Sequence, residues 1–241
     1  MEIGQVLSSK NTGDFEVIRY GGSRDVSVRF LETGYEVHGA QKGNVLRGNV
    51  RDLYYPTVQG VGVVGEVQRS NLKAMKVWRS MLDRCYSDKY HRARPTYRYA
   101  EVCEEWQYFP NFLEWFEVNY VEGYVLDKDC VDLRRKYYSP ETCNFIPESL
   151  NTLLSLLRED LTNITPRRTK GSKEYNGLWS VNVFGVYLGR CGDKGSASEL
   201  AEEFRAFYLE ERLLKYIADG EISKTLYDKI ILNLLRNNFL T

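Results

Sequence analysis

The chain has 241 residues, of which 43% are apolar and 13% aromatic, and its 33 basic residues balance its 33 acidic ones. This composition is that of a folded protein, and the zero net charge argues against a protein that coats nucleic acid indiscriminately. There is no run of 18 apolar residues, no signal-peptide pattern and no CxxC pair among the five cysteines. We therefore expect a cytoplasmic protein with reduced thiols and no membrane partner.

Residues 1–67 are predicted to form a small β module, SH3-like or similar. Short alternating stretches at 13–22, 25–37 and 45–56 predict strands, and glycine-containing turns separate them. A Gly-rich stretch at 59–67 has GxGxxG spacing, but no βαβ unit surrounds it, so a nucleotide-binding loop is not expected.

The middle of the chain combines helices with an uneven charge. Residues 70–86 predict a helix, and residues 70–98 carry a local net charge of +6. Residues 101–122 carry −6, and their aromatic side chains at helical spacing predict a core, with a break near Pro110. Such a dipolar segment either binds a polyanion on one side or pairs with itself within the fold.

The segment after this core begins with Asp127-Lys128-Asp129, at the end of a predicted strand over 124–131. By residue type alone, the three are either solvated charges at a strand end or part of a cation site, since Mg²⁺ and Mn²⁺ prefer oxygen ligands. A turn beginning at Ser139-Pro140, a brief strand and a helix from about Glu148 to Arg158 follow. The segment therefore predicts a β-hairpin and a helix.

In this order of elements and residues, "LDKD…YSPETCNFIPESLN" resembles the ββα-metal (HNH) core of phage-encoded homing endonucleases. The resemblance covers residues 72–155 and implies an HNH-like domain at 70–158 that binds double-stranded DNA. It implies that Asp127 and Asn151 hold Mg²⁺ or Mn²⁺ and that Asp129 assists. Lys128 occupies the place of the general-base histidine, and Thr142 that of an orienting asparagine. A lysine side chain accepts a proton from water only as the neutral amine, which at pH 7 requires that desolvation lower its pKa strongly, so the predicted fold does not by itself imply activity.

Three clusters of basic side chains are candidates for contact with DNA phosphates. They are Arg92, Arg94 and Arg98; Arg134, Arg135 and Lys136; and Arg167, Arg168 and Lys170. The last cluster lies in residues 159–174, whose composition predicts a basic linker.

Residues 175–241 predict two strands and two helices, with a capping box at Ser196-x-x-Glu199 and a helix cap at Ser223. The stretch "GLWSVNVFGVYLGRC…ELAEEFRAFY" resembles a degenerate AP2-type DNA-binding domain, in which a small sheet backed by a helix reads the major groove. Arg190 is the arginine that remains of those this family carries on its strands. The fold class expected for the whole chain is α+β.

Two functions follow from these predictions. The first is a DNA-binding, phage-type protein that nicks or cleaves DNA with a divalent ion. The second is an inactive HNH-derived binding protein, a regulator or counter-defence factor acting on DNA or on a host protein.

Overall fold

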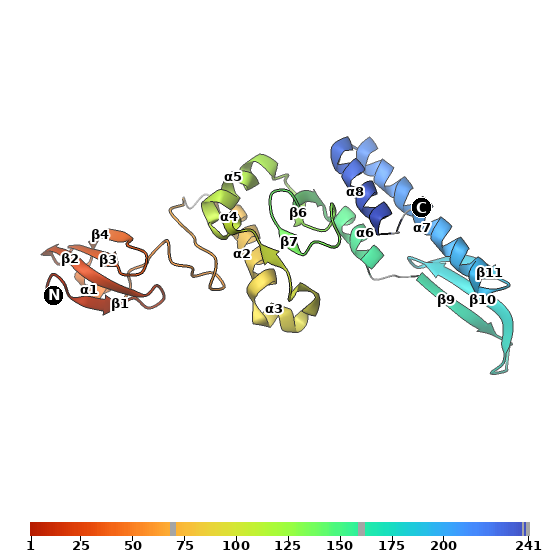
Figure 1. Cartoon of the computed structure of the whole chain (residues 1–241), viewed down its shortest axis with the longest axis horizontal. Helices are drawn as coiled ribbons and strands as arrows, with labels where there is room; N and C mark the ends of the chain where they lie inside the picture. The colour runs from red at the N-terminus through yellow and green to blue at the C-terminus, as the bar shows by residue number, and fades with distance from the viewer. Residues whose placement is uncertain (68–70, 159–161, 238, 240–241) are drawn as a thin grey trace. The chain divides into compact units, whose positions relative to one another are not determined.

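The structure is a computed structural model that describes residues 1–67, 71–158, 162–237 and 239. It is a mixed α+β protein, as the sequence predicts, with several small sheets (Figure 1). The chain divides into two compact units. The first comprises Met1–Asn119 with Lys136–Ser139, and the second comprises Tyr120–Arg135 with Pro140–Thr241. Among the described residues, no helix has the length and apolar character needed to cross a membrane.

A four-stranded antiparallel sheet begins the first unit. Its strands lie in the order β1 (Val6–Ser8), β2 (Asp14–Gly22), β3 (Asp25–Phe30) and β4 (Glu36–Ala40). Val26, Val28 and Phe30 of β3 are buried on one face, as the period of two predicts, and Ser27 between them is buried as well. The core of this sheet consists of Phe15, Val17, Val26, Val28, Phe30, Val45 and Val50.

The strand predicted over 45–56 does not form. Its first residues belong to the short helix α1 (Lys42–Leu46), and Gly48 then turns the chain with φ +67°. A Cβ at Gly48 would lie 2.6 Å from the Ser8 carbonyl oxygen, so the backbones approach each other here as only glycine allows. Val45 and Val50 are therefore buried from a helical turn and a loop, not from a strand.

The Gly-rich stretch lies against α2 (Leu72–Tyr86) and turns back on itself. Val58 and Gly62 bridge across a turn, and a Cβ on Gly62 would lie 2.5 Å from Leu82 Cδ1. Val63 next pairs with Tyr108, with the Val63 amide donating to the Gln107 carbonyl at 2.8 Å. Through these contacts, residues 58–63 pack against the helical part of the first unit and form hydrogen bonds with it.

The helical part of the first unit has an aromatic core, as predicted. Its elements are α2, α3 (Asp88–Ala93), a 3-10 turn (Pro95–Tyr97), β5 (Glu101–Val102), α4 (Glu104–Gln107), α5 (Phe109–Asn119) and β7 (Tyr137–Tyr138). Trp78, Trp106 and Phe112 are fully buried, and Trp78 Nε1 donates to the Trp106 carbonyl at 2.6 Å. β7 pairs in parallel with β5, and Tyr138 is buried.

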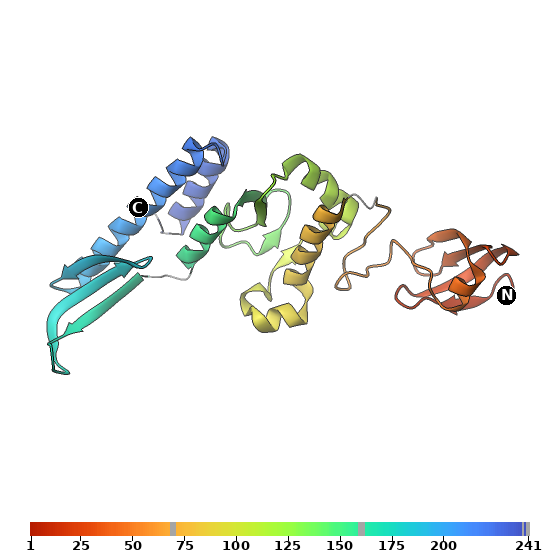
Figure 2. The same cartoon turned by 180° about the vertical axis from the view of Figure 1, so that it is seen from behind.

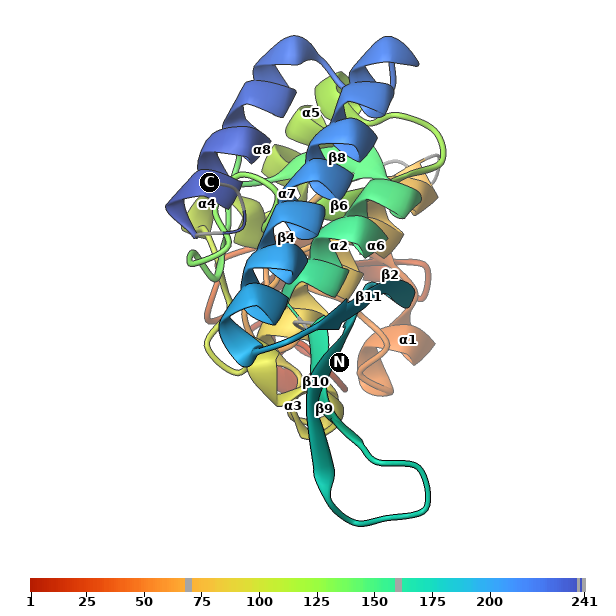
Figure 3. The same ribbon diagram turned by 90° about the vertical axis from the view of Figure 1, so that its right-hand side faces the viewer.

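The second unit contains two hydrophobic cores that share one helix. Its elements are β6 (Tyr124–Asp127), β8 (Asn144–Pro147), α6 (Glu148–Arg158), β9 (Thr162–Arg168), β10 (Tyr175–Val183), β11 (Val186–Cys191), α7 (Lys194–Ala218) and α8 (Lys224–Arg236). Ala197 and Ala201, near the start of α7, pack on the β9–β10–β11 sheet. Leu209 and Leu213, further along it, pack with α6 and α8 (Figure 3).

Two predictions for this unit need correction. Residues 162–168 were predicted to belong to a basic linker, but they form β9, an edge strand of the sheet (Figure 2). Ile164 of β9 pairs with Val181 of β10. Residues 159–161 of the predicted linker lie outside the described residues. The cap of α7 is Asp193, whose Oδ1 accepts from the Ser196 amide at 2.9 Å, and Ser196 itself lies within the helix. The bounds of α6 and the cap of α8 by Ser223 are confirmed.

Candidate functional site

The predicted strand–strand–helix arrangement is present in the second unit. β6 pairs antiparallel with β8, Asp127 lies opposite Asn144, and α6 starts directly after Pro147. The first strand is shorter than expected because it ends at Asp127, where the chain turns. The connection to β8, residues 128–143, is long and contains β7, whereas the sequence predicted a β-hairpin with its turn at Ser139-Pro140.

The Asp127 carboxylate explains why β6 ends where it does. Its Oδ2 accepts hydrogen bonds from the Asp129 amide at 2.8 Å and from the Cys130 amide at 2.6 Å. An aspartate that binds amides two and three residues ahead stabilises a turn. One oxygen of the expected metal ligand is therefore already engaged by the backbone.

Lys128 and Asp129 form a buried ion pair. The side chains are 7% and 6% exposed, and Lys128 Nζ lies 2.5 Å from Asp129 Oδ1. Asp127 is also buried, so the interpretation of this stretch as a solvated strand end is wrong. Charged groups are rarely buried without partners, because removing them from water costs several kcal/mol, on the order of 5 per ion.

Two buried cysteines, Cys130 and Cys143, lie near this turn, and neither has the exposed, readily ionised thiol of a nucleophile. Asn144 Nδ2 lies 3.7 Å from Cys130 Sγ, and Cys143 is 3% exposed. Burial, and then the negative charge of Asp127, raise the pKa of the Cys130 thiol well above its ordinary value. Since the thiolate is the reactive form, Cys130 is a packing residue at neutral pH.

The expected metal ligands come from adjacent elements. α6 packs on the β6–β8 pair through Leu150 and Ile146, and Asn151, the next residue on α6, is half-buried. Thr142 is buried in the connecting loop. Across residues 1–67, 71–158, 162–237 and 239, no group of three or more His, Cys, Asp or Glu side chains is arranged to hold a metal ion.

The donor set around Asp127 fits a divalent cation poorly. The Lys128 ammonium already places a positive charge beside Asp129, and Asp127 Oδ2 accepts two amide hydrogen bonds. A cation at this position would be repelled by the ammonium and would compete with those amides. Both histidines, His38 and His91, belong to the first unit, where His91 Nε2 lies 3.0 Å from the Arg84 carbonyl oxygen.

α8 holds the loop that follows the ion pair. Asn233 is buried, and its Nδ2 donates to the carbonyls of Asp129 at 3.0 Å and Cys130 at 3.1 Å. Its Oδ1 accepts from the Leu133 amide at 3.1 Å. The sequence analysis missed Asn233, and no local pattern marks it, because its partners lie about a hundred positions earlier in the chain.

Arg134, a predicted DNA contact, is part of the same connection. Its Nη2 donates to the Arg236 carbonyl at 2.7 Å, and its Nε donates to Asn237 Oδ1 at 3.0 Å. A guanidinium at the last carbonyls of a helix satisfies acceptors that the helix leaves unpaired. The Arg134 guanidinium therefore links the loop to the end of α8 through these hydrogen bonds, and it is not directed to a ligand.

The other predicted basic residues are exposed but fall into separate groups. Arg92, Arg94, Arg98 and Lys136 belong to the first unit, and Arg135, Arg167, Arg168 and Lys170 to the second. Two of them lie over aromatic rings: Lys136 over Tyr99 at 5.7 Å, and Arg168 over Tyr175 at 5.6 Å. In the second unit, Arg167 and Arg168 extend along β9 at the edge of the sheet.

One face of the β9–β10–β11 sheet is polar. α7 packs on the other face, through Val181 and Val183 (Figure 1). The register aligns Ser180 with Thr165 and with Arg190, so side chains of these three residues share a row. The residues that alternate onto this face are Asn163, Thr165, Arg167, Leu178, Ser180, Asn182, Tyr187 and Arg190, which are mostly polar. We refer to them below as the polar sheet face.

The chain matches no protein-family model, no curated protein and no solved structure. Its function is therefore inferred from the geometry of its own side chains.

Proposed function

We propose that the protein binds double-stranded DNA through the polar sheet face, and that its strand–strand–helix unit is a scaffold derived from an HNH nuclease. The observation that carries the proposal is a sheet with one face packed on α7 and the other face lined mostly by Asn, Ser, Thr and Arg side chains, with Leu178 and Tyr187 among them. The resemblance of this region to AP2-type domains agrees with the proposal. The β9 strand adds a third strand to the two that the sequence predicted.

The chemistry of this face suits base edges and phosphates. Asn182 and Asn163 offer both donors and acceptors, and Arg190 offers a two-pronged donor of the kind that binds guanine. Arg167 lies on the same face of β9, where a contact to the phosphate backbone would set the register. Ser180 Oγ is buried and has no hydrogen-bond partner within the described part of the chain.

The surroundings of Asp127 favour an inactive scaffold over an active nuclease. Lys128 is paired with Asp129, and Asp127 Oδ2 is bound to two backbone amides. Within the described residues the second unit has no histidine to act as the general base. The order of strands and helix, with Asn151 on the helix, supports the second candidate, a Mg²⁺- or Mn²⁺-dependent nuclease.

A binding experiment tests the DNA proposal. Arg190→Ala is expected to weaken binding to a specific duplex by about 1–3 kcal/mol, as for the loss of one base contact. Lys224→Ala, which removes an exposed lysine from α8, serves as the matched control and should leave affinity unchanged. Affinity should fall steeply with salt, because phosphate contacts release counterions. Equal affinity of Arg190→Ala and the native chain for DNA would refute the role of this face. Binding to a host protein that does not depend on salt would instead favour a protein partner.

A nicking experiment separates the two candidates. Supercoiled DNA with Mg²⁺ or Mn²⁺ should remain intact with the native chain and with Asp127→Ala. Nicking that Asp127→Ala abolishes would establish the nuclease instead. Nicking that persists in Asp127→Ala would place the chemistry outside this unit.

A further inference from the structure

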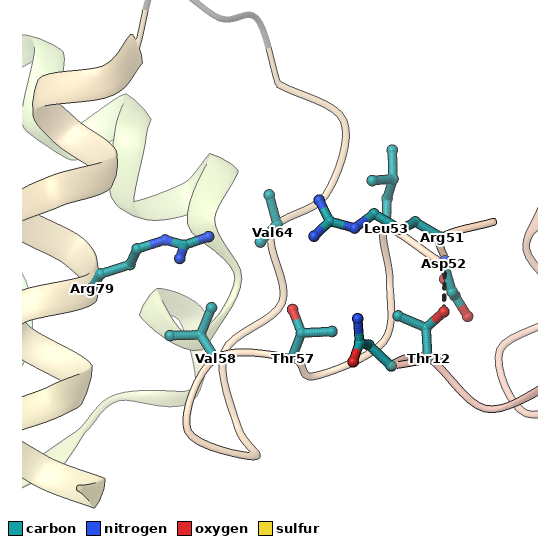
Figure 4. A pocket seen from close by; sticks show the side chains of 9 residues that line it. Thr12, Arg51, Asp52, Leu53, Thr57, Val58, Val64 and Arg79 are labelled. Carbon is teal, nitrogen blue, oxygen red and sulfur yellow. Dashed lines mark hydrogen bonds between the residues drawn. The ribbon is translucent and has the colours of Figure 1, made fainter. Parts of the chain in front are cut away.

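A cavity of about 420 Å³ lies in the first unit, beside the segment that joins the β sheet to α2 (Figure 4). Its volume falls in the range of small-molecule sites, roughly 300–1,000 Å³. The residues that line it are Asn11, Thr12, Arg51, Asp52, Leu53, Thr57, Val58, Val64 and Arg79.

The walls of this cavity are fixed by backbone hydrogen bonds and close packing. The Asp52 amide donates to Thr12 Oγ1 at 3.1 Å, and the Gly65 amide donates to the Leu53 carbonyl at 2.8 Å. The buried Val58 belongs to the turn that packs on α2. The backbone around the cavity is therefore held in place, while Arg51, Thr57 and Arg79, which line it, are exposed to solvent.

Two guanidinium groups point into this cavity from opposite sides. Arg79 extends from α2 and Arg51 from the facing segment, and Figure 4 shows their ends directed toward one another. Neither makes a hydrogen bond or an ion pair with the described residues. Two positive charges that share one cavity repel each other unless an anion lies between them.

The one acidic residue that lines the cavity does not neutralise the two arginines. Asp52 is buried, and its carboxylate accepts from Thr33 Oγ1 and, at 2.8 Å, from the Tyr54 amide. Both oxygens are thus used in holding the local loop together. The cavity keeps an excess of positive charge that an added anion would neutralise.

We propose that this cavity binds a phosphoryl group between Arg51 and Arg79. Guanidinium groups bind phosphate oxygens in a two-pronged geometry, and Thr57 and Asn11 add an uncharged hydroxyl and an amide to the lining. Leu53, Val58 and Val64 give the same cavity an apolar wall, which suits a ligand with a ring or hydrocarbon part. The phosphoryl group comes from a free nucleotide or from a DNA backbone phosphate, and the site uses none of the residues of the polar sheet face.

Titration of the full chain tests this proposal with three probes: inorganic phosphate, dAMP and a short duplex. Arg51→Gln and Arg79→Gln should each weaken binding of the preferred probe about tenfold or more, since hydrogen bonds to charged groups contribute roughly 1.5–3 kcal/mol. Arg24→Gln, at an exposed arginine outside the cavity, is the matched control and should bind as the native chain does. Circular dichroism checks that each variant is folded.

The probes also identify the source of the phosphoryl group. Tighter binding of dAMP than of phosphate, lost in both variants, indicates a free nucleotide. A loss confined to the duplex indicates a backbone phosphate, and Arg190→Ala then shows whether the polar sheet face binds DNA independently. No binding of any probe, or equal binding by the native chain and both variants, would overturn the proposal.

Discussion

Replacing Lys128 by Met removes the ammonium from a buried carboxylate. Asp129 is 4% exposed and its Oδ1 lies 2.5 Å from Lys128 Nζ, so the variant removes a positive charge that lies beside that carboxylate in a poorly solvated place. Removing one partner of a buried ion pair typically costs 3–5 kcal/mol, whereas replacing both partners by apolar groups is often nearly neutral. We therefore expect Lys128→Met to lower the free energy of unfolding by about 3 kcal/mol or more. Lys128→Met with Asp129→Leu should recover most of the loss.

An exposed pair on α8 is the matched control. Lys224 Nζ lies 3.5 Å from Asp228 Oδ1, with side chains 79% and 58% exposed. Surface pairs of this kind contribute about 0.2–1 kcal/mol, so Lys224→Met should have little effect. The contrast between the two methionine variants isolates the contribution of burial.

Urea-induced unfolding followed by circular dichroism measures the loss, and hydrogen exchange over residues 124–134 locates it. Exchange should rise first at the amides of Asp129 and Cys130, which bind Asp127 Oδ2. If Lys128→Met differs from the native chain by no more than Lys224→Met does, the ion pair is not a structural element of this turn.

Four further changes follow from the same structure. Asn233→Ala should cost about 2–4 kcal/mol in unfolding free energy, because three backbone groups lose their buried partner; a cost under 1 kcal/mol would contradict this. Ser223→Ala should cost about 1 kcal/mol by removing the cap of α8, read from thermal unfolding. Gly62→Ala should destabilise the first unit, since the new Cβ meets Leu82 and the Trp78 ring; an unchanged melting temperature would refute this. Iodoacetamide should modify the half-buried Cys191 well before Cys130, whose raised pKa keeps it protonated. Because that pKa is higher folded than unfolded, its contribution to stability is complete below about pH 8.5 and declines as the pH rises further.

The sequence predicted the elements whose signals are local. Apolar spacing and flanking residues identified α6 with the bounds that the structure shows, and a serine before a helical run identified the cap at Ser223. Alternation identified the buried side of β3. Each of these depends on neighbours within a few positions.

The misassigned elements depend on distant partners. β9 has the composition of a linker, and it becomes a strand because β10 offers it an edge to pair with. The Asp127–Asp129 turn has the composition of a solvated surface, and it is buried within a unit whose α8, through Asn233, lies about a hundred positions later. Residue types alone carry no information on such burial. For the candidate site, the sequence thus predicted the order of the elements but not the surroundings of the charges.

The placement of β7 bears on how the protein can be divided experimentally. The chain leaves the first unit after Asn119, returns for Lys136–Ser139, and leaves again. A fragment that stops at Asn119 lacks Tyr138 and the strand that pairs with β5, and a fragment that begins at Tyr120 carries that strand without its partner. Neither unit can therefore be separated intact by a single cut of the chain or transferred intact by a single recombination crossover.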